Sequence, residues 1–199
     1  MLKIKFSKYN FECGIDEAGR GSLAGPVTAA AVILKPNFNH KAINDSKKLL
    51  QKDRERLSKI IIENSISYSI QNIFPKKIDD VNILNASIIA MHKCIKNLKI
   101  RPEFLIIDGN RFKNFGNIPH ETIIKGDEKY LSIASASILA KYSRDIFMKK
   151  LSKEFPNYFW SKNKGYPTKQ HKEAIKKHGI TVHHRKSFKL FDEQLIIDF

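Results

Sequence analysis

Residues 14–35 read GIDEAGRGSLAGPVTAAAVILK, and this stretch carries most of the information about the fold. Apolar and small residues cluster on both sides of a glycine-rich segment without a helical period, so we expect short strands at 11–16 and 27–35. Two adjacent acids, Asp16 and Glu17, stand where the first strand gives way to the glycines. A surface turn would account for the glycines and a solvated loop for the acids, but neither accounts for the apolar runs around them.

Strands and helices alternate along the rest of the chain. We expect further strands at 66–74, 104–108 and 121–127, and helices at 47–64, 83–98, 132–151 and 168–179. The expected N-caps of three of these helices are Asp45 or Ser46, Asp79 or Asp80, and Thr168. This alternation is typical of an α/β layer fold, in which helices cover a central sheet.

The composition points to a polyanionic partner. The chain has 199 residues, with 36 Lys and Arg against 20 Asp and Glu, which gives a net charge of +16. Such an excess indicates nucleic acid or an anionic membrane surface as the partner. The length allows one domain with a small appendage, and we expect a domain at 1–152 and a lobe from 153 onward.

Features of membrane insertion and export are missing from the sequence. No apolar run approaches the roughly 20 residues that a membrane-spanning helix needs. The N-terminus MLKIKFSKYNFEC has neither the long apolar region nor the small-residue cleavage site of a signal peptide. We therefore expect a cytoplasmic protein that does not bind membranes.

The ends of three of the expected strands carry acids, namely Asp16 with Glu17, then Asp108, then Asp127. Each alone is an ordinary feature, since acids beside glycine are common in turns. Together, in an otherwise basic protein, they would repel each other unless a cation lies among them. Oxygen ligands without Cys or suitably spaced His favour Mg²⁺ or Mn²⁺ over Zn²⁺. Two such ions about 4 Å apart would activate water and stabilise the leaving oxygen of a phosphodiester.

Five motifs follow one another along nearly the whole chain. They are GIDEAGRGSLAGPV at 14–27, NDSKKL at 44–49, LIIDGN at 105–110, KGDEKYLSIASASILAKYSRD at 125–145 and KGYPTKQH at 164–171. Together they resemble the successive motifs of the ribonuclease HII family, the type 2 ribonucleases H. The resemblance implies a ribonuclease H fold, a mixed five-stranded sheet flanked by helices, with a small C-terminal helical lobe. It makes 1–152 the catalytic domain and 153–199 an extension that completes the substrate groove.

The resemblance also implies an activity and its metal ions. A member of this family is an endonuclease that hydrolyses the RNA strand of RNA/DNA hybrids and incises 5′ of single ribonucleotides embedded in duplex DNA. The products carry 3′-hydroxyl and 5′-phosphate ends, and the enzyme is expected to be a monomer. Two Mg²⁺ or Mn²⁺ ions would take part, with the catalytic and metal-binding residues implied to be Asp16, Glu17, Asp108 and Asp127.

Further residues match positions that contact substrate in the family. Gly19, Arg20 and Gly21 match the segment that reads the sugar at the RNA-to-DNA junction, where glycine lets the backbone approach a 2′-hydroxyl. Tyr166 matches a tyrosine that stacks on the deoxyribose after the ribonucleotide. Phosphate contacts or support of the site are implied for Lys47, Lys141 and Arg144, and a less defined role in substrate binding for His184 and Arg185. Without the resemblance, the lysines would be solvated surface charges and the tyrosine a packing residue.

Three positions depart from the usual pattern of the family. Ser22 stands where proline is common, Ser135 where alanine is, and Tyr142 where a small β-branched residue is. None of them removes a carboxylate or a glycine, so they concern local packing and substrate preference. The related type 3 enzymes have an extra N-terminal domain and usually lysine at the position of Arg20, so type 2 is favoured.

The C-terminus carries a second signal. Residues Gln194–Phe199 read QLIIDF and resemble the short peptides that dock on bacterial sliding clamps. The alternative is a final strand or helix packed on the lobe.

Two other functions compete with a hybrid-cleaving nuclease. A non-catalytic basic RNA-binding protein would have no use for four converging acids, since phosphate binding does not need them. Another nuclease of the same fold would not need Gly19 to Gly21 together with Tyr166, because these residues are implied to read a ribose.

Overall fold

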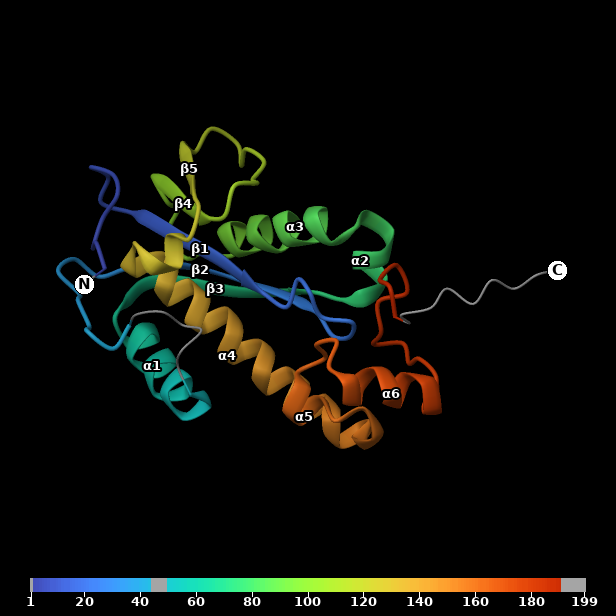
Figure 1. Cartoon of the computed structure of the whole chain (residues 1–199). Helices are drawn as coiled ribbons and strands as arrows, with labels where there is room; N and C mark the ends of the chain where they lie inside the picture. The colour runs from blue at the N-terminus through green and yellow to red at the C-terminus, as the bar shows by residue number, and fades with distance from the viewer. Residues whose placement is uncertain (1, 44–49, 191–199) are drawn as a thin grey trace.

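The structure is a computed structural model that describes residues 2–43 and 50–190 (Figure 1). Its centre is a five-stranded sheet in the order β3-β2-β1-β4-β5. The strands are β1 (Glu12–Ala18), β2 (Val27–Leu34), β3 (Ser65–Ile73), β4 (Phe104–Asp108) and β5 (His120–Ile123). β1 pairs antiparallel with β2 and parallel with β4, so the sheet is mixed, as the resemblance to the family implies.

Helices cover both faces of this sheet. They are α1 (Gln51–Glu63), α2 (Pro75–Val81), α3 (Ile83–Lys96), α4 (Leu131–Glu154), α5 (Trp160–Asn163) and α6 (Lys169–His178), with the short 3-10 helices η1 (Gly126–Glu128) and η2 (Pro156–Tyr158). Figure 1 shows α3 on one side of the sheet and α4, with α1 beside it, on the other. The predicted layered α/β fold is confirmed.

The residue pattern of β2 explains the two layers. Successive side chains of a strand point to opposite faces of the sheet. The odd-numbered residues from Val27 to Ile33 belong to the core with α3, whereas Ala30 and Val32 belong to the core with α1 and α4. A Cβ on Gly14 of β1 would lie 2.2 Å from a backbone carbon of α4. Small residues in the sheet therefore let α4 pack closely against it.

The start of α3 differs from the prediction. Asn82 caps the helix, and its side-chain oxygen accepts a hydrogen bond from the N–H of Asn85 at 3.0 Å. The predicted caps Asp79 and Asp80 are wrong, because they fall inside a separate short helix, α2. Pro75 not only ends the preceding strand but also opens α2, since its fixed φ suits the first helical turn.

Of the other predicted helix caps, one is confirmed and the rest lie outside the described residues. Thr168 caps α6 as predicted and accepts a hydrogen bond from the N–H of His171 at 3.2 Å. Gly179 ends that helix with a positive φ of 75°, a conformation that glycine adopts without strain. The predicted caps of the first helix, Asp45 and Ser46, lie outside the described residues.

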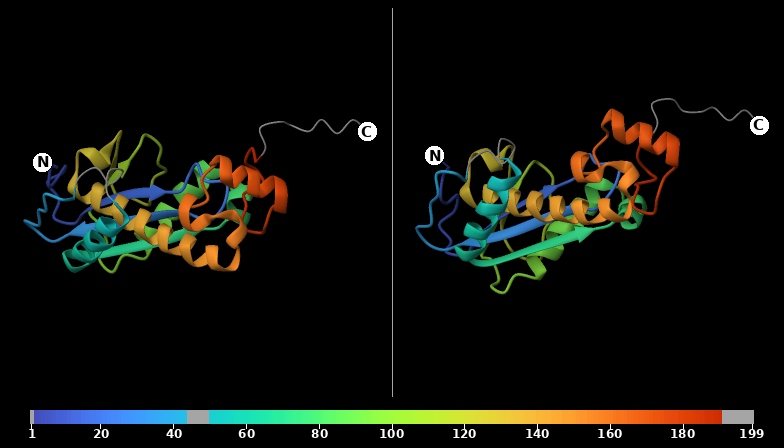
Figure 2. Two further views of the ribbon diagram at one scale, coloured as in Figure 1. Left: turned by 60° about the horizontal axis from the view of Figure 1, so that its bottom comes forward. Right: turned by 90° about the horizontal axis from the view of Figure 1, so that it is seen from below.

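The C-terminal lobe packs on the glycine-rich segment that follows β1. Figure 2 shows α5 and α6 at one end of the molecule, beyond the C-terminal end of α4. Leu23 shares a buried core with Met148 of α4 and Trp160 of α5. The expected boundary after residue 152 falls within α4, so the lobe and the sheet-bearing part share a helix. Among the described residues, no helix is long and apolar enough to span a membrane.

Candidate active site

The parallel pairing of β1 and β4 brings two acids together. Ile15 of β1 lies opposite Ile107 of β4, so the next residues, Asp16 and Asp108, are neighbours toward the carboxyl ends of the two strands. Glu17 follows on β1 and lines the same small pocket as Asp108. The sheet therefore gathers three of the predicted acids at one edge.

Asp127 reaches this edge from a different kind of element. β5 ends at Ile123, and Asp127 lies in η1 rather than at a strand end, which corrects the prediction. The chain leaves the strand direction at Lys125, which has a left-handed conformation with φ of 55°. The N–H of Gly126 then donates to Oδ1 of Asp108 at 2.7 Å, so η1 is tied to the end of β4.

Burial and mutual repulsion dominate the electrostatics of Asp16. Its side chain is buried, which raises its pKa well above the ordinary value, and the charges of Glu17 and Asp108 raise it further. A hydrogen bond from Ser137 and the charge of Lys141, both on α4, oppose this rise. Because the protein compensates the negative charge only in part, the site suits a cation.

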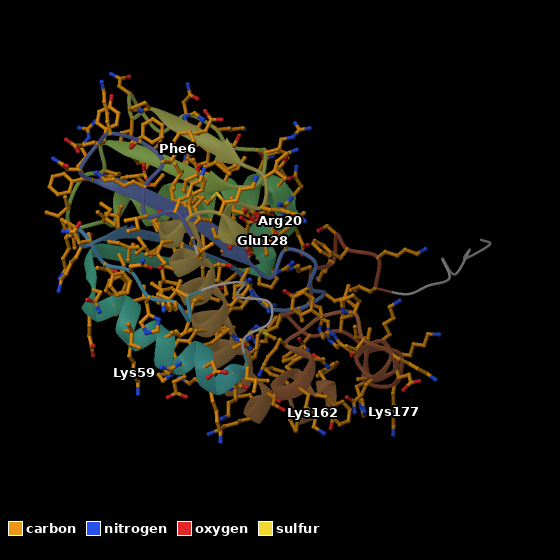
Figure 3. All side chains as sticks on the ribbon, turned by 60° about the vertical axis from the view of Figure 1, so that its left-hand side comes forward. Phe6, Arg20, Lys59, Glu128, Lys162 and Lys177 are labelled. Atoms are coloured by element: carbon orange, nitrogen blue, oxygen red, sulfur yellow. The ribbon has the colours of Figure 1, made fainter. Side chains whose placement is uncertain are left out.

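Glu17 interacts with the arginine of the glycine-rich segment. Burial raises the pKa of Glu17, and Arg20 opposes that rise, since its Nη1 lies 3.1 Å from Oε1 of Glu17. The side chain of Arg20 is 51% exposed, and Figure 3 shows it in the region where β1 ends. An ion pair with one exposed partner contributes little stability, so Arg20 can exchange this partner for another anion.

The donor atoms fit a hard divalent cation in an open arrangement. Within residues 2–43 and 50–190, no three His, Cys, Asp or Glu side chains form a group ready to hold a metal ion. The pocket lined by Glu17 and Asp108 has a volume of about 20 Å³, enough for about one water. Mg²⁺ commonly binds through one or two carboxylates and completes its shell with waters and substrate phosphates, so such an arrangement is compatible with it.

Two glycines of the segment after β1 have different surroundings. Gly19 has a positive φ of 88°, and a Cβ there would lie 2.1 Å from Nε of Arg144. The fold itself therefore requires glycine at this position. At Gly21, a Cβ would meet no atom of the described residues within 4 Å. Because packing does not demand glycine there, the prediction that this position approaches a ligand is favoured.

Two buried arginines hold the carbonyl groups of this segment. Arg144 is 2% exposed and donates from Nε and Nη2 to the carbonyl oxygens of Pro26 and Ala24, at 2.9 and 3.1 Å. Arg185 is 0% exposed and donates, at 2.7 to 3.1 Å, to the carbonyl oxygens of Gly19, Arg20 and Gly25. Of the two roles predicted for Arg144, a phosphate contact or support of the site, this burial favours support, and it favours the same role for Arg185.

Tyr166 stands beside the glycine-rich segment. The carbonyl oxygen of Gly165 accepts a hydrogen bond from the N–H of Leu23 at 2.8 Å, which joins the two segments. The guanidinium carbon of Arg144 lies 5.4 Å from the centre of the Tyr166 ring, a cation–π distance. The tyrosine is nevertheless 41% exposed, so part of its ring is accessible for stacking.

His184 belongs to a buried hydrogen-bond network of the lobe. Its Nδ1 accepts a hydrogen bond from the N–H of Thr181 at 2.9 Å, and its Nε2 lies 3.3 Å from Nε2 of His171. Burial, followed by the charge of His171, lowers the pKa of His184 to about 4. The imidazole is therefore uncharged at neutral pH, which favours a supporting role over a phosphate contact.

Ser137 is a contact of the site that the sequence did not predict. Lys141 donates from Nζ to Oγ of Ser137 at 2.9 Å, and Ser137 in turn bonds to Asp16. The usable signal is the spacing of four residues between Ser137 and Lys141, which places them on one helix face. The half-buried Lys141 remains suited to a phosphate contact. The other predicted lysine, Lys47, lies outside the described residues.

The three departures from the family pattern lie in packed surroundings. Ser22 is fully buried in the glycine-rich segment, and Tyr142 is half-buried on α4. Ser135 is also fully buried and donates from Oγ to the carbonyl oxygen of Leu131 at 2.7 Å, one turn earlier in α4. The hydroxyl of Ser135 is therefore satisfied within its own helix.

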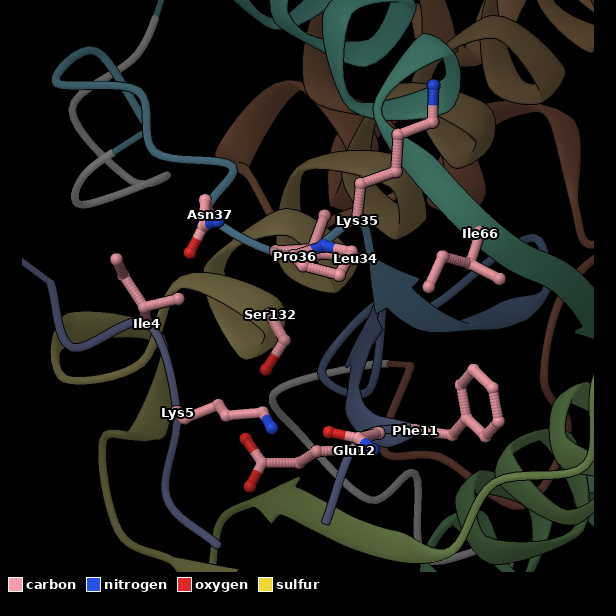
Figure 4. Close-up of a pocket in the computed structure, with 11 residues that line it drawn as sticks. Ile4, Lys5, Phe11, Glu12, Leu34, Lys35, Pro36, Asn37, Ile66 and Ser132 are labelled. Carbon is pink, nitrogen blue, oxygen red and sulfur yellow. The ribbon is translucent and has the colours of Figure 1, made fainter. Parts of the chain in front are cut away.

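A second cavity lies away from these residues. It has a volume of about 220 Å³ and opens beside the start of β1 and the end of β2. Figure 4 shows the side chains of Lys5, Glu12 and Ser132 pointing into it. None of the predicted site residues lines this cavity, so it is not part of the candidate active site.

Comparison with known proteins agrees with this geometry. A model of the family "Ribonuclease HII" matches residues 13–191. The ribonuclease HII of Christiangramia forsetii is 60% identical over 186 residues, which are 94% of each chain. The ribonuclease H2 of Pyrococcus horikoshii has a TM-score of 0.76 at 23% identity, over 90% of this chain and 94% of that one. The structure of the PCNA:RNase HII complex from Archaeoglobus fulgidus has a TM-score of 0.76 at 25% identity, over 93% of this chain and 98% of that one. With relatives so similar over almost its full length, this chain belongs to the ribonuclease HII family.

Proposed function

We propose that this enzyme incises duplex DNA on the 5′ side of a single embedded ribonucleotide, besides the cleavage of RNA/DNA hybrids that its family performs. One observation carries the proposal: the open space at Gly21 and the exposed ring of Tyr166 belong to two segments that are hydrogen-bonded together. A backbone that can approach a 2′-hydroxyl recognises ribose, and a neighbouring aromatic ring can stack on the sugar that follows. The pair is suited to a junction between one ribonucleotide and DNA.

The family uses divalent metal ions, and the donor set of this chain is consistent with them. The residues that would hold the ions are Asp16, Glu17, Asp108 and Asp127. Bound Mg²⁺ or Mn²⁺ would supply an activated water and neutralise charge on the leaving oxygen. The raised pKa of Asp16 supports this assignment, because a nearby cation would relieve the repulsion among the acids.

Basic side chains are proposed to hold the duplex across the site. Lys141 lies beside the Ser137 hydroxyl that bonds to Asp16, so a phosphate near the acids would meet its charge. In the lobe, Lys162 and Lys177 project outward from α5 and α6 (Figure 3). These charges are suited to sequence-independent contacts with the DNA backbone.

The test compares cleavage of two labelled duplexes, one RNA/DNA hybrid and one DNA duplex with a single ribonucleotide, in Mg²⁺, in Mn²⁺ and in chelator. We expect cleavage of both, and loss of it in chelator. The cut in the second duplex should lie 5′ of the ribonucleotide and leave 3′-hydroxyl and 5′-phosphate ends. Cleavage of the hybrid alone would overturn the proposal while leaving the family activity in place.

We also propose that residues Gln194–Phe199 dock on a sliding clamp. These residues lie outside the described part of the chain, and the support is their sequence together with the Archaeoglobus fulgidus relative, whose structure is a PCNA:RNase HII complex. A truncation ending at Glu193 should lose clamp binding in a pull-down or by surface plasmon resonance, with unchanged cleavage of short duplexes. Equal clamp binding by the full chain and the truncation would refute this proposal.

A further inference from the structure

We propose that Arg185 is a positioning residue that sets the direction of the backbone amides with which the enzyme recognises ribose. The inference rests on the proposed function, because it concerns the same glycine-rich segment. Arg185 lies in the lobe, 164 to 166 residues away from Gly21, Arg20 and Gly19, and its side chain reaches the back of that segment.

The hydrogen bonds of Arg185 fix two consecutive peptide groups. Nη2 donates to the carbonyl oxygen of Gly19 at 2.7 Å, and Nη1 donates to the carbonyl oxygen of Arg20 at 2.8 Å. In a planar trans peptide the C=O and the following N–H point in opposite directions. With both carbonyls held toward the guanidinium, the N–H groups of Arg20 and Gly21 point away from it. Two donors therefore face away from the guanidinium at Gly21, a residue whose Cβ would meet no described atom within 4 Å.

A third carbonyl completes the arrangement. Nε and Nη2 of Arg185 also donate to the carbonyl oxygen of Gly25, at 3.1 and 3.0 Å. The same guanidinium thus bridges the beginning and the end of the segment between Gly19 and Gly25. These bonds use all three nitrogens of the guanidinium fork, whereas a lysine ammonium offers its three donors from a single nitrogen and cannot span the same acceptors in this geometry.

The backbone around Arg185 is itself held in place. The N–H of Arg185 donates to the carbonyl oxygen of Leu23 at 2.8 Å. The next two residues are tied to α2: the carboxylate of Asp79 accepts hydrogen bonds from the N–H groups of Lys186 and Ser187, both at 3.0 Å, and from Oγ of Ser187 at 2.6 Å. Asp79, which was wrongly predicted to cap a helix, therefore anchors the backbone that follows Arg185.

Burying the guanidinium of Arg185 costs free energy unless its hydrogen bonds replace the lost hydration. A fully buried guanidinium loses its hydration, and hydrogen bonds to carbonyl groups compensate that loss only when the geometry is good. A phosphate-binding arginine would instead be exposed. The burial of Arg185 and its three backbone acceptors thus agree with positioning and disagree with direct contact to the substrate.

The test is the preference of the full-length protein for ribose, measured with the variant Arg185→Lys. Fluorescence anisotropy gives dissociation constants for a DNA duplex with one ribonucleotide and for the same duplex in DNA only, with Ca²⁺ in place of Mg²⁺ so that no strand is cut. In Arg185→Lys we expect the preference for the ribonucleotide to fall about tenfold, because backbone N–H groups that no longer point toward the ribose lose a hydrogen bond to it. Affinity for the all-DNA duplex should change less than about twofold, because it depends on phosphate contacts.

Lys186→Ala is the matched control, since it removes a neighbouring cation that is exposed. It should leave the ribose preference unchanged.

An unchanged preference in folded Arg185→Lys, or an equal loss of affinity for both duplexes, would overturn the inference. If Arg185→Lys does not fold, as judged by circular dichroism, Asp79→Asn replaces it, and an unchanged preference in that variant overturns the inference too. Absence of any ribose preference in the wild-type protein would instead contradict the proposed function.

Discussion

Asp108→Asn should fold normally and lose turnover by roughly 10³-fold, the size of effect expected when a site loses a group that stabilises charge in the reaction. The fold should survive because the hydrogen bond from the N–H of Gly126 to Oδ1 of Asp108 needs only an oxygen acceptor, which an amide retains. Turnover should fall because the amide carries no negative charge for a divalent cation and is a weak bridge between two ions.

The matched control is Asp80→Asn, the same chemical change on an exposed acid of α2 that does not line the pocket of Glu17 and Asp108. Its turnover should equal that of the wild-type protein. Single-turnover rates on a saturating concentration of the labelled hybrid, with melting temperatures for each variant, make the comparison. A folded Asp108→Asn protein with a near-normal rate would exclude Asp108 from the catalytic site.

The second large effect is a contrast between two glycines. Gly21→Val should melt at nearly the wild-type temperature but cut the single-ribonucleotide duplex roughly 10²-fold more slowly, because a branched side chain pushes the ribose out of place. Gly19→Ala should lose stability as well, by about 1–3 kcal/mol for the strained backbone alone. Its Cβ would also collide with the buried side chain of Arg144, at 2.1 Å from Nε.

Thermal melting and the two cleavage rates, measured side by side on both variants, separate these roles. A Gly21→Val protein that melts early would show that the fold, not the substrate, requires glycine at 21. A Gly21→Val protein with normal incision would show that the segment does not approach the ribose.

Local structure was predictable because its causes lie within a few residues. The alternation from Val27 to Ile33 already assigns one set of side chains to each face of β2, and the structure places them in two cores. Thr168 and Gly179 bound α6 as expected, since capping depends on adjacent backbone groups. The acid set came from the ends of the expected strands and matched the motifs of a family, and parallel strands explain why Asp16 and Asp108 meet.

Predictions failed or were incomplete where a residue's partners are distant in sequence. Asp79 looked like a helix cap, but its hydrogen bonds reach Lys186 and Ser187, 107 and 108 residues away. For Arg185 the resemblance implied only a less defined role in substrate binding, because charged residues are rarely buried and the sequence contains no sign that this one is. The tertiary structure shows a guanidinium closed in by three carbonyl groups of a segment about 160 residues earlier.

The sequence by itself determined most of the strands and helices and the glycine-rich segment, and it predicted the acids of the site, because periodicity, capping and motif chemistry depend on neighbouring residues. Only the tertiary structure decided which charged groups are available to a substrate and which serve the fold. Arg20 is half exposed while Arg144 and Arg185 are buried behind it, although all three stand in motifs of the same family. The physical reason is that burial depends on the packing of α4 and the lobe against one short segment, and no local pattern encodes that packing.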